Sequence, residues 1–168
     1  HGGGTGVDSH PGQGTRIRVY WPVAQGSPGP AGKDEFIGED VLTGLRAKGG
    51  VLIVDDEGLV RDVVAGALRR VGFRVWTAVD GHDGLRAFAQ HLDEIAAVVL
   101  DLTMPRMDGQ EVFRALRAQR PELPILLISG YHEDDALAGL LKLERTGFLP
   151  KPFVTEELLQ ALGACIIP

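Results

Sequence analysis

Short apolar runs alternate with amphipathic stretches through residues 51–166, and this alternation is typical of repeated strand–helix units around a parallel sheet. The runs are rich in Val, Ile and Leu without polar alternation, as strands covered on both faces require. The five predicted strands are Val51–Val54, Phe73–Thr77, Ala97–Leu100, Ile125–Ile128 and Gly147–Leu149. We therefore expect an α/β domain whose sheet has helices on both faces.

Apolar residues between and after these strands recur at helical spacing. One stripe contains Val60, Val64, Leu68 and Val71, and another contains Leu158, Leu162 and Ile166. Thr155, which precedes two glutamates, is the predicted N-cap of the last helix. Residues 39–48 favour a further short helix. These stripes predict core-facing helices.

The first part of the chain has a different pattern. Residues 15–21 alternate polar and apolar side chains like a strand, residues 11–14 favour a turn, and residues 5–9 supply a hairpin partner. Because an isolated hairpin is at best marginally stable, we interpret residues 1–22 as the end of a larger domain, with a disordered leader as the alternative. The Gly- and Pro-rich stretch 23–38 is a predicted linker.

Composition and charge exclude several classes of function. The chain has 168 residues, 44% of them hydrophobic, and its net charge of −6 lies entirely in residues 51–168. An acidic domain without a basic stripe repels phosphate backbones, so direct nucleic-acid binding is not expected. The single cysteine excludes a disulfide within the chain, and no signal peptide or bilayer-spanning stretch is apparent. We expect a cytoplasmic domain without a membrane segment.

Polar residues follow four of the predicted strands. Asp55, Asp56 and Glu57 follow the first, Asp101 the third, Ser129 the fourth and Lys151 the fifth. The carboxyl ends of parallel strands meet at one edge, where ligands bind in open α/β sheets. Carboxylates gathered within about 4–6 Å repel one another, which favours a bound cation, and Mg²⁺ suits a few carboxylates with water and a phosphate oxygen.

A carboxylate facing Mg²⁺, beside an ammonium and a hydroxyl, is suited to in-line attack on a phosphoryl group. The metal and the lysine would neutralise charge on the transferred oxygens, and the hydroxyl would donate to one of them. The residues therefore predict formation of an aspartyl phosphate.

Five segments together resemble the receiver domain of two-component response regulators. They are Val51–Glu57, Val98–Pro105, Met107–Gly109, Ile128–Gly130 and Phe148–Phe153. The resemblance implies a flavodoxin-like, doubly wound sheet of strand order 2-1-3-4-5. It also implies a phosphoacceptor signalling function, with a histidine kinase or a histidine phosphotransfer domain as the phosphodonor.

The resemblance assigns roles to single residues. Asp101 would accept the phosphoryl group, Lys151 would pair with it, and Ser129 and Phe148 would act as the switch pair. Asp55, Asp56, Asp101 and the backbone carbonyl of Thr103 would hold Mg²⁺. Gly130 stands where the family often has Ala, and the Lys151–Pro152 bond is typically cis. The chain itself would catalyse at most its own phosphotransfer and dephosphorylation.

Residues 1–22 are similar to the last hairpin of a histidine-kinase ATP-binding domain. This similarity implies a hybrid kinase as the parent protein, which could be membrane-anchored, with residues 23–48 as a linker and residues 49–168 as its receiver. In such a receiver the last two helices and the fifth strand would change their partner affinity or form a homodimer.

Two alternatives remain at this point. A haloacid-dehalogenase-like phosphatase also places an aspartate such as Asp101 after an apolar strand, but it needs a second Asp where Thr103 stands. The other alternative is a non-signalling interaction module with a receiver fold, which would have lost an acid or the lysine.

Overall fold

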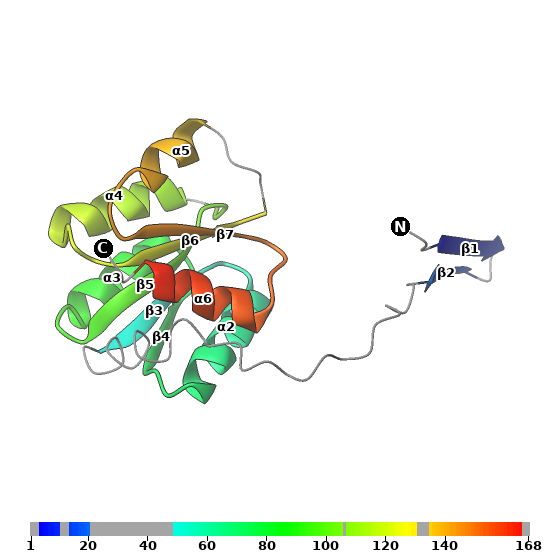
Figure 1. Ribbon diagram of the computed structural model, residues 1–168, viewed down its shortest axis with the longest axis horizontal. Coiled ribbons are helices and arrows are strands. Elements are labelled where there is room, and N and C mark those ends of the chain that lie inside the picture. The colour runs from blue at the N-terminus through cyan, green and yellow to red at the C-terminus, as the bar shows by residue number, and fades with distance from the viewer. Residues whose placement is uncertain (1–3, 11–13, 21–48, 106, 131–134, 166–168) are drawn as a thin grey trace, which may run out of the picture. The chain divides into compact units, whose positions relative to one another are not determined.

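A computed structural model describes residues 4–10, 14–20, 49–105, 107–130 and 135–165, and for residues 4–10, 14–20 and 135–137 it describes only the backbone. Contacts divide the chain into two units, His1–Glu35 and Phe36–Pro168. In the first unit, β1 (Gly4–His10) and β2 (Gly14–Tyr20) pair in antiparallel register (Figure 1). The predicted hairpin is therefore confirmed.

The second unit contains a five-stranded sheet in which every pairing is parallel. Its strands are β3 (Gly50–Val54), β4 (Val75–Ala78), β5 (Ile95–Asp101), β6 (Ile125–Ser129) and β7 (Thr146–Pro150). The spatial order β4-β3-β5-β6-β7 corresponds to 2-1-3-4-5, as predicted. Every residue of the three central strands is buried, which explains their continuous apolar sequence.

Two layers of helices cover the sheet (Figure 1). The helices are α2 (Gly58–Arg70), α3 (Gly81–Gln90), α4 (Gly109–Gln119), α5 (Asp135–Leu141) and α6 (Thr155–Ala164). One hydrophobic core joins α2 and α6 to the sheet, and a second joins α3, α4 and α5 to it. Val64 and Leu68 of the first predicted stripe and Leu158 and Leu162 of the second are buried in the first core.

The topology determines where a site can form. From β3, the chain moves to β4 on one side and then returns past β3 to β5 on the other. This reversal of winding opens a crevice beyond the carboxyl ends of β3 and β5. Side chains that follow these two strands therefore face a shared space.

Two local predictions were wrong. Phe73 precedes β4, because its N–H donates to the carbonyl of Leu68 and closes the end of α2, with Gly72 at φ 90° between them. Phe73 is buried in the core there. Thr155 is the first residue of α6 and not its N-cap, since the cap is Val154, whose N–H donates to the carboxylate of Glu157 at 3.0 Å.

Other predictions concern residues outside the described ranges. These are the linker 23–38, the short helix 39–48, turn residues 11–13 and Ile166. The domain boundaries at 22 and 48 remain predictions. Among the described residues, no helix combines the length and the hydropathy that a membrane span needs.

Candidate functional site

The polar residues predicted to converge do lie at one edge of the sheet. Asp55 follows β3, Asp101 ends β5, Ser129 ends β6 and Lys151 follows β7. Asp55, Asp101 and Ser129 are buried, with Asp101 only 1% exposed. Burial of two carboxylates is costly unless charged or hydrogen-bonding partners compensate them.

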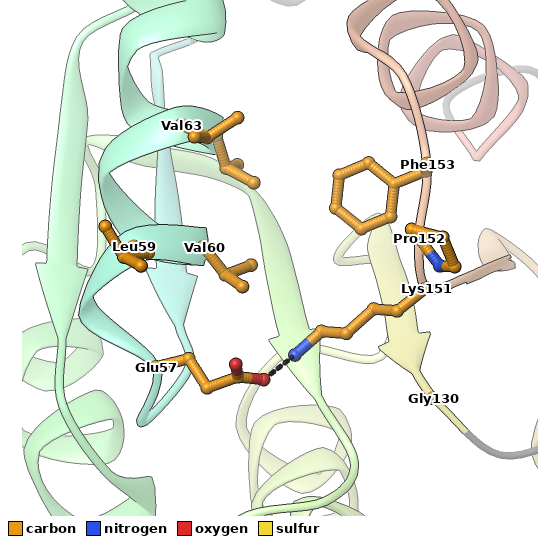
Figure 2. A pocket seen from close by; sticks show the side chains of 9 residues that line it. Glu57, Leu59, Val60, Val63, Gly130, Lys151, Pro152 and Phe153 are labelled. Carbon is orange, nitrogen blue, oxygen red and sulfur yellow. Dashed lines mark hydrogen bonds and ion pairs between the residues drawn. The ribbon is translucent and has the colours of Figure 1, made fainter. Parts of the chain in front are cut away.

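Lys151 supplies this compensation by contacting three carboxylates. Its Nζ atom lies 2.8 Å from Oδ2 of Asp101, 3.0 Å from Oδ2 of Asp55 and 3.1 Å from Oε1 of Glu57. Figure 2 shows the contact with Glu57, whose side chain is 60% exposed. The single ammonium of Lys151 therefore compensates part of the negative charge of the buried pair and also contacts Glu57.

The acids retain negative charge that one ammonium does not fully balance. Burial raises the pKa of the Asp55 carboxyl above its ordinary value, and the nearby charge of Asp101 raises it further, although the Lys151 hydrogen bond opposes the change. Burial alone would lower the pKa of Lys151, but its bonds to Asp101 and Asp55 outweigh burial and raise it overall. A second cation would favour the charged form of Asp55.

Three carboxylates are grouped closely enough to hold such a cation. Asp55, Asp56 and Asp101 offer oxygen atoms that all lie within 4.8 Å of one another, and Asp56 is the exposed member. An all-oxygen set with one solvent-facing acid suits a hard divalent cation that keeps some of its water. The predicted metal ligands Asp55, Asp56 and Asp101 are thus brought together.

Thr103 connects the buried aspartate to the buried serine. Its backbone N–H donates to Oδ1 of Asp101 at 2.9 Å, and its Oγ1 lies 3.2 Å from Oγ of Ser129. Ser129 in turn accepts at its carbonyl a hydrogen bond of 2.8 Å from the N–H of Lys151. Hydrogen bonds therefore join the loop after β5, the last residue of β6 and the residue after β7.

The other predicted residues of this edge occupy supporting positions. Phe148, in the middle of β7, is partly buried and packs against the second core. The Lys151–Pro152 peptide bond is cis, as the resemblance implied. Gly130 follows Ser129, and a Cβ atom built on it would have no neighbour within 4 Å among the described residues.

The helix α4 packs directly against the backbone of Asp101. A Cβ atom at Gly109 would lie 2.3 Å from the carbonyl oxygen of Asp101 and 2.5 Å from Cα of Leu102, so only glycine fits. The preceding Asp108 caps the helix through its carboxylate, which accepts from the N–H of Gln110 at 3.1 Å. The Met107–Gly109 motif therefore fixes the loop that follows the aspartate.

An apolar groove of about 550 Å³ opens beside Lys151. Val60 and Val63 of α2 face Pro152 and Phe153 across it (Figure 2), and Leu59 also lines it. Leu59 is 82% exposed and Val63 is 62% exposed. Large apolar side chains exposed together next to a charged site are typical of a contact surface.

Two contacts were missed by sequence reasoning. The sequence places Glu57 after the first strand without indicating a role for it, and the resemblance implies a role only for the carbonyl of Thr103 and none for its hydroxyl. The position of Glu57 directly after the two aspartates was the only available signal. Which acid turns toward Lys151 depends on the loop conformation, and the side-chain pairing of Thr103 depends on a residue 26 positions away.

Comparisons with known proteins agree with this arrangement. The family described as the response regulator receiver domain matches residues 51–163. The sensor kinase CckA of Brucella abortus is 34% identical over 163 residues, which cover 94% of this chain and 17% of that kinase. The response regulator MprA of Mycolicibacterium vanbaalenii is 39% identical over 116 residues, which cover 69% of this chain and 49% of the regulator.

Solved structures give the same result. A crystal structure of the CheX–CheY–BeF3–Mg complex from Borrelia burgdorferi matches 71% of this chain and 90% of that chain, with a TM-score of 0.66 and 25% identity. This chain thus spans a sixth to a half of the length of the sequence relatives described above.

None of these matches favours the two alternatives, a haloacid-dehalogenase-like phosphatase and a non-signalling interaction module. With its five-stranded sheet, its acidic edge and its family match, the chain belongs to the response regulator receiver domains of two-component signalling systems.

Proposed function

We propose that Asp101 is the phosphoacceptor and that it takes its phosphoryl group from a phosphohistidine of a partner protein. The observation that carries this proposal is the position of its carboxylate, which is buried between Nζ of Lys151 at 2.8 Å and the N–H of Thr103 at 2.9 Å. Both donors would balance charge at the reacting group.

In the proposed step, a carboxylate oxygen of Asp101 forms a bond to phosphorus while the phosphorus–nitrogen bond of the donor breaks. The electron pair of that bond remains on the imidazole nitrogen, which takes a proton from solvent. Lys151 neutralises a phosphoryl oxygen, and Ser129 donates its hydroxyl hydrogen to another. Lys151 already contacts Asp101, so little side-chain movement is needed.

Asp55, Asp56 and Asp101, together with the carbonyl of Thr103, are proposed to hold Mg²⁺. Mg²⁺ supplies neutralisation of the transferred oxygens when bound. The closely spaced carboxylate oxygens and the raised pKa of Asp55 support this assignment. The name of the Borrelia burgdorferi complex, which includes magnesium and a fluoride of beryllium, also supports it.

Phosphorylation is proposed to change the surface formed by α5, β7 and α6. Ser129 lies opposite Pro150 in the β6–β7 pairing, and the same β7 strand carries Phe148. A movement of Ser129 toward the phosphoryl group would therefore act on β7, which is an edge strand. Phe148 would follow as the aromatic partner of the switch, and a second receiver or another protein would bind the altered face.

The groove beside Lys151 is proposed to receive the helix that carries the donor histidine. Its exposed Leu59 and Val63 give that helix apolar surface to cover, and Lys151 and Glu57 lie at its inner end. The donor is proposed to be a histidine kinase or a histidine phosphotransfer domain, and both would act in the cytoplasm.

The parent protein is proposed to be a hybrid histidine kinase. In this proposal residues 1–22 end its ATP-binding domain, residues 23–48 form a linker and residues 49–168 form the receiver. The alignment with the sensor kinase supports it, because that alignment covers 94% of this chain and so extends well beyond residues 51–163.

The phosphoacceptor assignment is tested by labelling with a small phosphodonor and Mg²⁺. The wild-type chain should form an acid-stable, base-labile acyl phosphate, and Asp101→Asn should form none. Asp93→Asn, an exposed aspartate after α3, is the matched control and should label normally. Undiminished labelling of Asp101→Asn would refute the assignment, and labelling that survives excess chelator would refute the role of the metal.

A further inference from the structure

Thr103 is exposed, yet it makes hydrogen bonds to two buried residues. Its backbone N–H is bound to the carboxylate of Asp101, and its side-chain hydroxyl lies 3.2 Å from the hydroxyl of Ser129. Asp101 and Ser129 are 1% and 4% exposed. The side chain of Thr103 therefore spans from the loop after β5 to the last residue of β6, on the solvent side of the proposed phosphoacceptor.

The two hydroxyl groups form a hydrogen bond that phosphorylation would disturb. A phosphoryl group offers only acceptor oxygens, so Ser129 must use its single hydroxyl hydrogen to bind it. Either hydroxyl can donate in the resting hydrogen bond, but a Ser129 that donates to the phosphoryl group no longer donates to Thr103. A movement of the Ser129 oxygen atom toward the phosphoryl group would lengthen its bond to Thr103 in either arrangement. An oxygen–oxygen distance of 3.2 Å lies beyond the usual range for hydroxyl hydrogen bonds, which indicates a weak bond that is readily exchanged.

We propose that the Thr103 hydroxyl is a positioning group that holds Ser129 in its resting place, so that phosphorylation exchanges the Thr103–Ser129 hydrogen bond for a Ser129–phosphoryl hydrogen bond. This inference rests on the proposed function, in which Asp101 is the acceptor and Ser129 is the switch hydroxyl. In this inference the Thr103 side chain stabilises the resting conformation. It therefore shifts the equilibrium between the resting and the phosphorylated conformations toward the resting one.

The side-chain contact of Thr103 can be removed without changing its backbone contacts. A substitution at residue 103 leaves the N–H that donates to Asp101 in place, together with the carbonyl proposed to bind the metal. Thr103→Val removes only the hydroxyl and keeps the branched shape of the side chain. Thr103→Ser keeps the hydroxyl and is the conservative rescue variant. Thr77→Val, on exposed β4 residue Thr77, is the matched control.

The test is calorimetric titration with beryllofluoride at saturating Mg²⁺, because this reagent imitates a phosphoryl group. The loss of a hydrogen bond at the weak end of the usual net range predicts that Thr103→Val binds about threefold more tightly than wild type. Thr103→Ser and Thr77→Val should bind like wild type.

A double-mutant cycle with Ser129→Ala isolates the pair. In the Ser129→Ala background, Thr103→Val should have no effect on beryllofluoride affinity. An affinity of Thr103→Val within twofold of wild type would overturn the inference, and so would a gain that persists in the Ser129→Ala background. Thr103→Ala, which should behave like Thr103→Val, serves if the valine variant does not fold. Failure of the wild-type chain to bind beryllofluoride would instead contradict the proposed function itself.

Discussion

The ammonium of Lys151 lies 2.8 Å from a carboxylate oxygen of Asp101, although the two residues are 50 positions apart in the chain. This contact is made across β6, because Asp101 ends β5 and Lys151 follows β7. Asp101 is 1% exposed and the Lys151 side chain 15% exposed, so the pair is largely removed from water. Buried charge of this kind depends strongly on its partner.

Removal of the lysine should destabilise the folded chain. Lys151→Met leaves Asp55 and Asp101 buried without their ammonium, and the expected loss in the free energy of unfolding is about 3 kcal/mol. Urea unfolding measures this loss. Addition of Mg²⁺ should recover more stability in Lys151→Met than in wild type, because the cation then meets two uncompensated carboxylates.

Glu57 provides the comparison for that experiment. Glu57→Gln removes an exposed carboxylate from the same ammonium, and an exposed ion pair contributes at most about 1 kcal/mol. If Glu57→Gln lowered the free energy of unfolding as much as Lys151→Met, the loss in Lys151→Met could not be attributed to the buried acids Asp55 and Asp101.

Two glycines next to the site should respond oppositely to alanine. Gly109→Ala places a methyl group within 2.3 Å of the Asp101 carbonyl oxygen and should lower the free energy of unfolding by about 2–3 kcal/mol. Gly130→Ala meets no atom of the described residues within 4 Å and should leave the free energy of unfolding unchanged or raise it by up to about 1 kcal/mol. Chemical denaturation of the two variants checks both values, and equal losses would contradict the packing described for α4.

The exposed apolar groove should matter only for a protein donor. Leu59→Ser removes the most exposed apolar side chain of the groove and should slow phosphotransfer from a histidine donor about thirtyfold, because burial of a leucine contributes about 2 kcal/mol to docking. Labelling by a small phosphodonor should not change. Leu92→Ser, which alters an exposed leucine after α3, is the control. Slower labelling by both kinds of donor would show that the substitution acts on the site and not on docking.

Cys165 should make the folded chain less stable in alkali. Burial raises the pKa of its thiol from 9.0 to about 11. Below pH 9 the thiol is protonated in both states and has no pH-dependent effect. Between about pH 9 and 11 only the unfolded chain loses the proton, so rising pH favours unfolding, by about 2–3 kcal/mol in total.

Urea unfolding across that pH range in wild type and Cys165→Ala gives the measurement. The decline between pH 9 and 11 should be smaller in the alanine variant, although its stability at pH 7 is lower because of the cavity it leaves. Parallel pH profiles for the two proteins would exclude the thiol as the cause.

Most of the sheet could be predicted from the sequence because burial on both faces leaves a direct mark on composition. Val51–Val54 and Ile125–Ile128 are continuous apolar runs, and the structure places both in strands that are completely buried. Phe73 was misassigned because its apolar character fits a strand and a helix end equally well. Its hydrogen bond to Leu68 and the left-handed Gly72 decide in favour of the helix end.

The sequence also determined which residue types lie at the acidic edge, since the Asp, Ser and Lys residues directly follow the predicted strands. Their individual environments were decided only by the tertiary structure. Neighbouring Asp55 and Asp56 are equivalent in the sequence, yet one is buried beneath Lys151 and the other faces solvent. Contacts such as Thr103 with Ser129 depend on how separate loops pack, and a single chain sequence contains no local signal for a distance between them.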